Sequence, residues 1–434
     1  MKKHLFFLIA ATILVSACSQ NKYAHVSNGE FKVKGKAYRF VGVNFWYGAI
    51  LGSPGEGGDR KRLESELDAM KELGITNLRI LVGADGPTEV PAVDAGLSDA
   101  DGSPFGQSVW SAVVQPTLQT APGVYNQDLL DGLDWLMAEL GKREMMAVLY
   151  LNNTWSWSGG YGQYLSWAHP ESHAGTERYY TDTAADSLFR NHVRFILGRT
   201  NRYNGLKYTE DPAIFSWQLG NEPRPLGRDN RQAFIDWIER TAKLIRSMDP
   251  NHMISTGNEG EMGCDNNMEI VRAINAIPEI SYMTIHIWPF NWGWIRTGSV
   301  SGNLENAKEQ TTKYIEMHLP VADEYGKPMV IEEFGYPRDG FKFKLGTSTE
   351  SRDAYFSHVF SLLEKSGQDH SKLAGCNIWA WGGYAVPPAD HDYWVKGDDY
   401  TGDPAIEQQG LNSVFMADKS TIGLIKEVNS KLRK

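Results

Sequence analysis

The sequence predicts an α/β protein whose strands and helices close into a (β/α)8 (TIM) barrel with long βα loops and an N-terminal hairpin. Eight short apolar runs rich in β-branched and aromatic residues recur along the chain, and longer amphipathic segments follow most of them. Such alternation indicates a parallel sheet covered by helices, and eight units favour closure into a barrel. The length of 434 residues, with 41% hydrophobic and 22% charged residues, suffices for one large core and excludes a disordered chain.

The expected elements follow one another without a low-complexity linker, so residues 24–434 are expected to form a single domain. The hairpin should pair residues 31–33 with residues 38–45 across a turn at Lys34-Gly35. The eight expected strands cover residues 40–45, 77–82, 145–151, 214–219, 253–256, 282–287, 329–334 and 375–381. Amphipathic segments predict helices at residues 60–73, 126–142, 187–203, 231–248, 304–325 and 350–364.

Residues 1–17 have the pattern of a cleaved export signal. Lys2 and Lys3 precede an apolar run over residues 5–15, which is shorter than the roughly 20 residues that a membrane-spanning helix needs. The small residues before Cys18 resemble the bacterial lipoprotein lipobox, which implies that Cys18 is lipidated and becomes the first residue of the mature chain. The expected product is an exported domain held by lipid at the bacterial cell envelope, periplasmic or surface-exposed. The alternative is a plain secretory signal with an incidental cysteine.

Charge and motif content exclude several function classes. A formal net charge of -10 provides no basic surface for nucleic acid, and no Gly-rich phosphate-binding motif follows a strand. The sequence lacks the Cys and His spacing of a structural zinc site; Cys264 and Cys376 could form a disulfide or remain separate buried thiols. Acidic clusters around His391 and at residues 398–399 are expected to be solvated loop charge rather than a metal site. No metal or cofactor is expected.

Four long intervals follow strands, at residues 83–125, 153–180, 287–302 and 382–410, and they are rich in Gly, Pro and aromatic residues. In a (β/α)8 barrel such loops share the face that carries active sites. All but three of the 14 Trp residues lie in these loops or at strand ends. Aromatic faces suit stacking on sugar rings, although loops that fold over one another would also use Trp for packing.

Two strand ends carry glutamates. The fourth expected strand ends in Gly220-Asn221-Glu222-Pro223-Arg224, where Pro223 stops the strand and restricts Glu222. The seventh ends in Glu332-Glu333-Phe334-Gly335. Both ends belong to one rim of the barrel. Glycoside hydrolysis needs two such groups, one to protonate the leaving oxygen and one to attack the sugar or activate water.

These motifs resemble the retaining glycoside hydrolases of clan A. Residues 152–156, 219–224 and 256–260 narrow the resemblance to glycoside hydrolase family 5, on its β-mannanase branch. The resemblance implies that Glu222 is the general acid/base and Glu333 the nucleophile, with carboxyl oxygens about 5 to 5.5 Å apart. It selects Glu333 through the family's Glu-Phe-Gly pattern, and strand alternation would let only one of Glu332 and Glu333 face the barrel mouth.

The resemblance implies further substrate-binding residues. Asn221 would hold the 2-hydroxyl of the sugar at the cleavage point, Arg79 would keep the nucleophile ionised, and Trp379 would form the platform under that sugar. His286 and Trp288 share a face by alternation, and most relatives carry Tyr where this chain has Trp288; an indole can donate a hydrogen bond but cannot titrate. On the leaving-group side the resemblance implies Arg224, Glu259 and Trp155.

The implied activity is retaining endo-β-1,4-mannanase action on β-mannan or manno-oligosaccharides, with membrane association only through the lipid anchor. An exo-β-mannosidase of the same family is the main alternative, because the loops at residues 153–180 and 382–410 could close one end of the cleft. An endoglucanase is a second alternative. A surface lipoprotein that only binds glycans is a third, but it would have no use for paired strand-end glutamates.

Overall fold

The computed structural model describes residues 22–87, 114–171 and 175–433; the expected export signal and Cys18 lie outside these residues. Its main sheet contains eight parallel strands in the order β10-β9-β8-β5-β4-β13-β12-β11. Their bounds are β4 (Phe40–Asn44), β5 (Asn77–Leu81), β8 (Met146–Tyr150), β9 (Ile214–Gln218), β10 (Met253–Ser255), β11 (Met283–Ile287), β12 (Met329–Phe334) and β13 (Leu373–Ile378). The eight predicted strands are therefore all present.

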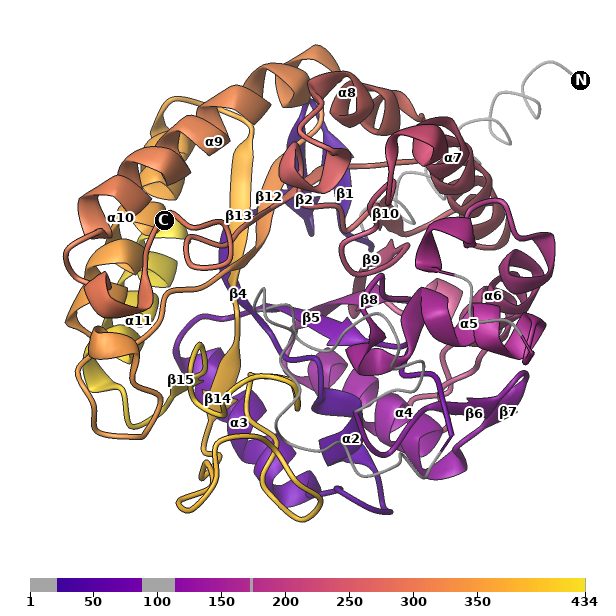
Figure 1. Ribbon diagram of the computed structural model, residues 1–434, viewed down its shortest axis with the longest axis horizontal. Coiled ribbons are helices and arrows are strands. Elements are labelled where there is room, and N and C mark those ends of the chain that lie inside the picture. Colours follow the sequence, from indigo (N-terminus) through magenta and orange to yellow (C-terminus); the bar gives the residue numbers. More distant parts are fainter. Residues whose placement is uncertain (1–21, 88–113, 172–174, 434) are drawn as a thin grey trace, which may run out of the picture.

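The two outer strands of this order, β10 and β11, meet and close the barrel. The Ser281 amide donates to the Ile254 carbonyl at 2.7 Å, and the Ile254 amide donates to Ser281 Oγ at 3.1 Å. Further along, Thr284 Oγ1 donates to the Asn258 carbonyl at 2.7 Å. Figure 1 shows the resulting ring of strands inside a ring of helices. The predicted (β/α)8 barrel is confirmed.

The helices are α2 (Gly48–Gly52), α3 (Arg60–Glu72), α4 (Gln127–Lys142), α5 (Gly160–Ala168), α6 (Thr183–Leu197), α7 (Arg231–Met248), α8 (Met268–Ala276), α9 (Leu304–Glu324), α10 (Glu350–Gln368) and α11 (Lys419–Leu432). The six predicted helices are present. The helix predicted at residues 187–203 begins earlier, because the Asp182 side chain caps its first turn by accepting from the Ala185 amide, and it ends earlier, at Leu197 before Gly198. The outer ring also includes α8 and α11, which the sequence analysis did not predict.

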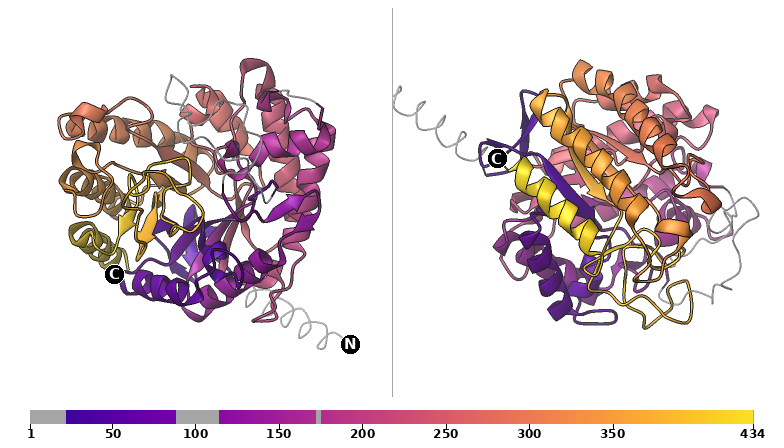
Figure 2. Two further views of the ribbon diagram at one scale, coloured as in Figure 1. Left: turned by 60° about the horizontal axis from the view of Figure 1, so that its bottom comes forward. Right: turned by 90° about the vertical axis from the view of Figure 1, so that its left-hand side faces the viewer.

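A small antiparallel sheet of β1 (His25–Ser27), β2 (Glu30–Val33) and β3 (Lys36–Ala37) precedes the barrel. The turn at Lys34-Gly35 is confirmed, with positive φ at both residues, but the second arm is Lys36–Ala37 and not residues 38–45, because Phe40–Asn44 form the barrel strand β4. Phe31 of β2 is buried against Phe40, Phe215 and Tyr282 near the N-terminal ends of barrel strands. Figure 2 shows this sheet and the long loop after β13 at opposite ends of the barrel.

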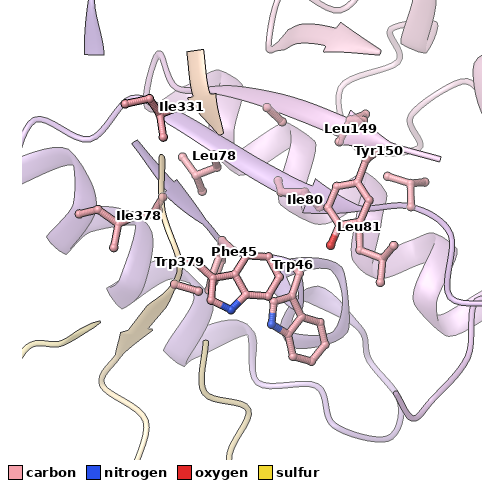
Figure 3. Close-up of a cluster of buried hydrophobic side chains, with 14 of the residues drawn as sticks. Phe45, Trp46, Leu78, Ile80, Leu81, Leu149, Tyr150, Ile331, Ile378 and Trp379 are labelled. Carbon is pink, nitrogen blue, oxygen red and sulfur yellow. The ribbon is translucent and has the colours of Figure 1, made fainter. Parts of the chain in front are cut away.

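The hydrophobic core runs through the barrel wall to its mouth. Leu78, Ile80 and Leu149 come from adjacent strands, while Trp46 and Trp379 lie where the strands end (Figure 3).

Cys264 and Cys376 are both buried with free thiols, so they are two separate thiols rather than a disulfide. None of the helices in the described part of the chain combines the length and apolar character needed to cross a bilayer.

Asp85, in the loop after β5, makes stability depend on pH. Its Oδ1 accepts from Gln119 Nε2 at 2.9 Å and from the Tyr164 hydroxyl at 3.3 Å, while its buried Oδ2 has no partner among the described residues. Burial raises the pKa of Asp85 to about 7. The native state therefore binds more protons than the unfolded chain between about pH 4 and 7, so unfolding free energy should fall by up to about 4 kcal/mol as pH rises through that window.

Asp85→Asn should remove this part of the pH dependence, because the amide keeps the acceptor oxygen and does not ionise. Denaturant unfolding of both proteins at several pH values from 4.5 to 8 checks the expectation through the slope of stability against pH. Equal slopes in the parent and the variant would contradict it.

Candidate active site

Glu222 and Glu333 converge at the mouth of the barrel. Glu222 follows β9 and Glu333 lies near the end of β12, and both are buried. His286 of β11 lies between them: its Nδ1 is 2.9 Å from Glu222 Oε1 and 3.4 Å from Glu333 Oε2. One carboxylate oxygen of each glutamate and a ring nitrogen of His286 all lie within 4.8 Å of one another. This separation fits the close pair of a retaining glycosidase and is too short for the roughly 6.5 to 9.5 Å of an inverting one.

The backbone and both carboxylate oxygens of Glu222 are held in place. Its φ of 50° lies in the left-handed region, a strained conformation for a residue with a side chain. The Glu222 amide donates to the Gly257 carbonyl at 2.9 Å, and Thr154 Oγ1 donates to the Glu222 carbonyl at 2.7 Å. Besides the contact of Oε1 with His286, Oε2 accepts from the Trp155 indole at 2.5 Å. The general acid/base candidate therefore has a fixed direction.

Arg79 of β5 is fully buried and contacts the nucleophile candidate directly. Its Nη1 donates to Glu333 Oε1 and, at 3.1 Å, to Asn44 Oδ1. Its Nη2 donates to Asn221 Oδ1 and its Nε to Gln218 Oε1, each at 2.7 Å. Burial raises the pKa of Glu333 well above its usual range, and the Arg79 guanidinium opposes this shift and favours the carboxylate.

A β-bulge in β12 changes the expected geometry of the two adjacent glutamates. In the pairing of β11 with β12, Ile285 is opposite Ile331 and His286 is opposite Glu333, so Glu332 is the extra residue. Both side chains consequently reach inward: Glu333 contacts Arg79 and His286 at the mouth, and Glu332 contacts Gln218 and Tyr282 in the barrel interior. Only Glu333 faces the mouth, as expected, but simple strand alternation is not the reason, because the bulge leaves both side chains inside the barrel. The choice of Glu333 depends on the family pattern and on its position beside Glu222.

Aromatic residues line the site next to Glu333. Trp288 Nε1 donates to Glu333 Oε2 at 3.3 Å, which gives the indole the contact that the sequence analysis left open. The ring of Trp379 meets that of Trp288 edge-on, with 6.0 Å between centroids, just beyond the end of β13. The two indoles therefore form an aromatic pair beside the nucleophile candidate.

A preformed ion pair lies on the other side of Glu222. Arg224 donates from Nε and Nη2 to the two oxygens of Glu259, at 2.5 and 2.6 Å. Glu259 is buried, whereas Arg224 keeps 30% of its side chain exposed and lies over the ring of Trp155, 4.9 Å from its centroid. A planar, partly exposed guanidinium of this kind can donate hydrogen bonds to sugar hydroxyls, which is the role that the family resemblance implies for this group of residues.

The distances among Glu222, His286 and Glu333 would also suit a metal ion, and they form the one group of this kind found within the described ranges. The fixed positive charge of Arg79 on Glu333 opposes a second cation there.

The loop residue His391 contacts Asp390 at 2.8 Å and Asp398 at 2.7 Å through its two ring nitrogens, and these hydrogen bonds raise the pKa of His391. His391 and the two aspartates therefore form a hydrogen-bonded loop cluster.

Sequence reasoning missed several polar residues that hold the site. Asn44 and Gln218 fix Arg79, and Asn153 Oδ1 accepts from Asn221 Nδ2 at 3.2 Å. Each missed residue lies at or just past the end of an apolar strand run. A buried polar residue at a strand end was the available signal, because such a group needs a partner inside the barrel.

Trp288→Phe should lower kcat/KM by about 10-fold, because the ring remains while the hydrogen bond to the Glu333 carboxylate is lost. Trp288→Tyr, which brings back a donor, should retain more activity than the Phe variant. Initial rates on an aryl β-mannoside compare the three proteins. Equal rates in the Phe variant and the parent would show that the indole N–H contributes nothing.

Comparisons with known proteins show which family and which proteins the chain resembles. The model of the family described as GH (glycoside hydrolase) family 5 beta-mannosidase-like matches residues 21–434. The chain is 28% identical over 392 residues to a protein named putative mannan endo-1,4-beta-mannosidase 9 from Oryza sativa, covering 86% of this chain and 85% of the relative. It is 30% identical over 283 residues to mannan endo-1,4-beta-mannosidase 1 of Arabidopsis thaliana, covering 60% of this chain and 64% of the relative.

Solved structures show the same similarity. A glycoside hydrolase family 5 mannosidase from Rhizomucor miehei superposes with a TM-score of 0.81 at 29% identity, covering 95% of this chain and 98% of the other. A mutant of that enzyme was solved in complex with mannosyl-fructose. An endo-1,4-beta-D-mannanase from Thermotoga petrophila has a TM-score of 0.66 at 23% identity, with 91% and 99% coverage, and shares the fold.

Proposed function

The chain belongs to the GH family 5 beta-mannosidase-like family and is a glycosidase, and from this premise we propose that it hydrolyses β-1,4-mannosidic bonds with retention of anomeric configuration. The observation that carries the proposal is the convergence of Glu222 and Glu333 within reach of one glycosidic bond. The names of the relatives and the mannosyl-fructose complex of the R. miehei mutant support mannose as the sugar at the cleavage point.

The geometry supports a two-step displacement. Glu333 attacks the anomeric carbon while Glu222 gives its proton to the departing oxygen, which forms a glycosyl ester on Glu333. Glu222 then takes a proton from the water that releases the sugar. Arg79 and Trp288 hold the attacking carboxylate through hydrogen bonds, and Trp155 and His286 hold the proton donor. Proton NMR of the product as it forms tests retention, since the β-anomer should appear first.

We propose endo action on mannan-type polysaccharides, as the names of the plant relatives suggest. Incubation with β-mannan should release a spread of oligosaccharides and new reducing ends. A cellulose-type β-glucan serves as the comparison substrate. Faster release of reducing ends from the glucan would favour the endoglucanase alternative, and no release from any glycan would favour the binding-only alternative.

Exo action by a β-mannosidase is the second candidate, and the loops at the barrel mouth favour it. Trp46 Nε1, beyond β4, donates at 2.8 Å to the Gly402 carbonyl in the loop that follows β13. Tyr400 of that loop stacks on Trp394 with 5.2 Å between centroids, and Trp46 packs against Trp157 from the loop after β8 at 5.7 Å. Three loops thus join on one side of the mouth, as expected for a pocket. Mannohexaose separates the modes, because exo action releases mannose alone and endo action a series of products.

The cellular location is a separate proposal. We infer from the signal pattern at residues 1–18 that the chain is exported and lipidated on Cys18 at the bacterial cell envelope. In fractionated cells the parent should occur in the membrane fraction, and Cys18→Ser should shift it to the soluble or uncleaved form. A Cys18→Ser protein that is cleaved before residue 18 and still stays in the membrane fraction would contradict lipid anchoring.

A further inference from the structure

Glu332 takes no part in the two-step reaction described above, yet it is fully buried directly beside the nucleophile candidate. The bulge that makes it the extra residue of β12 turns its carboxylate into the barrel interior. A buried carboxylate is costly unless it is paired and hydrogen-bonded, so its presence at this position requires an explanation.

Both oxygens of Glu332 face hydrogen-bond donors. Oε1 accepts from the Tyr282 hydroxyl at 3.0 Å, and Oε2 accepts from Gln218 Nε2 at 2.5 Å. Burial raises the pKa of Glu332, and the charge of Arg79 together with the hydrogen bonds from Gln218 and Tyr282 opposes this shift and favours the carboxylate. The cation that balances it is Arg79, whose Nε lies 3.8 Å from Glu332 Oε2.

Arg79 therefore interacts with two carboxylates, through two different edges of its guanidinium group. Nη1 contacts Glu333 directly, and the Nε edge faces Glu332, with Gln218 bridging between them. Gln218 can bridge in only one orientation: its amide oxygen accepts from Arg79 and its amide nitrogen donates to Glu332. Glu332 thus fixes the side chain that fixes Arg79.

We propose that Glu332 is a positioning residue that shares the charge of Arg79 with Glu333 and so keeps Glu333 able to attack the sugar. Glu333 loses its negative charge as the bond to the anomeric carbon forms, so an exclusive ion pair with Arg79 would stabilise the starting carboxylate more than the transition state. A second carboxylate on the guanidinium weakens that pairing. The inference rests on the proposed function, because it takes Glu333 as the nucleophile.

The Glu332→Gln substitution tests the effect of the Glu332 charge alone. The amide can accept from Gln218 and donate to the Tyr282 oxygen, so the hydrogen bonds can survive while the charge is lost. Without that charge, Glu333 should become nearly the sole ionic partner of Arg79, and the pKa of Glu333 should therefore fall. The titratable groups that face Glu333 are Arg79, Tyr150, Glu222, Glu259 and His286, and the substitution of Glu332 leaves all of them in place.

On an aryl β-mannoside whose first step limits the rate, Glu332→Gln should lower kcat by about 10-fold to 100-fold with little change in KM. The acid limb of kcat against pH should move down by about one pH unit. Tyr282→Phe is the matched control, because it removes one donor to Glu332 and keeps the charge of Glu332. The acid limb of kcat in this variant should lie at the same pH as in the parent. An unshifted acid limb in Glu332→Gln, or an equal shift in both variants, would overturn the proposal.

A readout without substrate separates this inference from the proposed function. Carbon-13 NMR of carboxyl-labelled glutamate follows the titration of Glu333, assigned by its loss in Glu333→Gln. The Glu333 signal should titrate at lower pH in Glu332→Gln than in the parent. If the parent hydrolyses no mannoside, the proposed function fails while this titration still decides whether Glu332 tunes Glu333; an unchanged titration overturns the inference.

Discussion

Glu333→Gln is expected to reduce turnover of mannosides by at least about 10⁴-fold, the largest effect of any single substitution in this protein. The amide is nearly the same size as the carboxylate, so it can keep the contact with Trp288 and the packing at the mouth. It cannot form the glycosyl ester, and the first step of the displacement is lost. Initial rates on an aryl β-mannoside and on mannohexaose, with thermal unfolding to verify the fold, measure the effect.

Three comparisons make the Glu333 prediction specific. Glu309→Gln on the exposed face of α9 should leave the rates unchanged. Glu332→Gln should lose far less activity than Glu333→Gln. A 2-deoxy-2-fluoro mannosyl fluoride should label the peptide that carries Glu333, which mass spectrometry of the digested protein identifies. A label on Glu332, or near-parent rates in Glu333→Gln, would move the nucleophile or end the proposed mechanism.

The barrel was predictable because each unit repeats two local patterns. Buried parallel strands appear as short apolar runs, and surface helices show a 3.6-residue period, so the order of elements follows from the sequence. The glutamates were found for a related reason: a charged residue directly after a buried run stands at the rim of the barrel. Neither inference needed contacts between distant residues.

Short or distant features escaped this reasoning. α8 has only nine residues, a length at which periodicity gives little signal, and the Asn267 cap and its tertiary packing stabilise it. The bulge at Glu332 depends on how β12 pairs with β11, which no pattern within β12 reveals. Gln218 becomes part of the site only because Arg79 and Glu332 converge on it from other strands. What the sequence could not supply is the pairing of specific side chains across the barrel.

Glu222→Gln should lower turnover by about 10²- to 10⁴-fold, and the size of the loss should depend on the leaving group. A poor leaving group such as a sugar hydroxyl needs the proton of Glu222, whereas a nitrophenolate departs without one. The variant should therefore lose far more activity on mannobiose than on a dinitrophenyl β-mannoside. With the activated substrate the glycosyl ester still forms on Glu333. Its hydrolysis is then slow, because the variant has no general base to take a proton from water.

Azide should restore part of the activity of Glu222→Gln on that activated substrate, because it attacks the glycosyl ester without needing a general base. The product should be β-mannosyl azide, since two displacements retain configuration, and NMR identifies its anomer. Azide should not rescue Glu333→Gln in this way, because that variant forms no ester to attack. An α-azide from Glu222→Gln would mean that azide displaces the leaving group directly, and the two glutamates would then have to exchange roles.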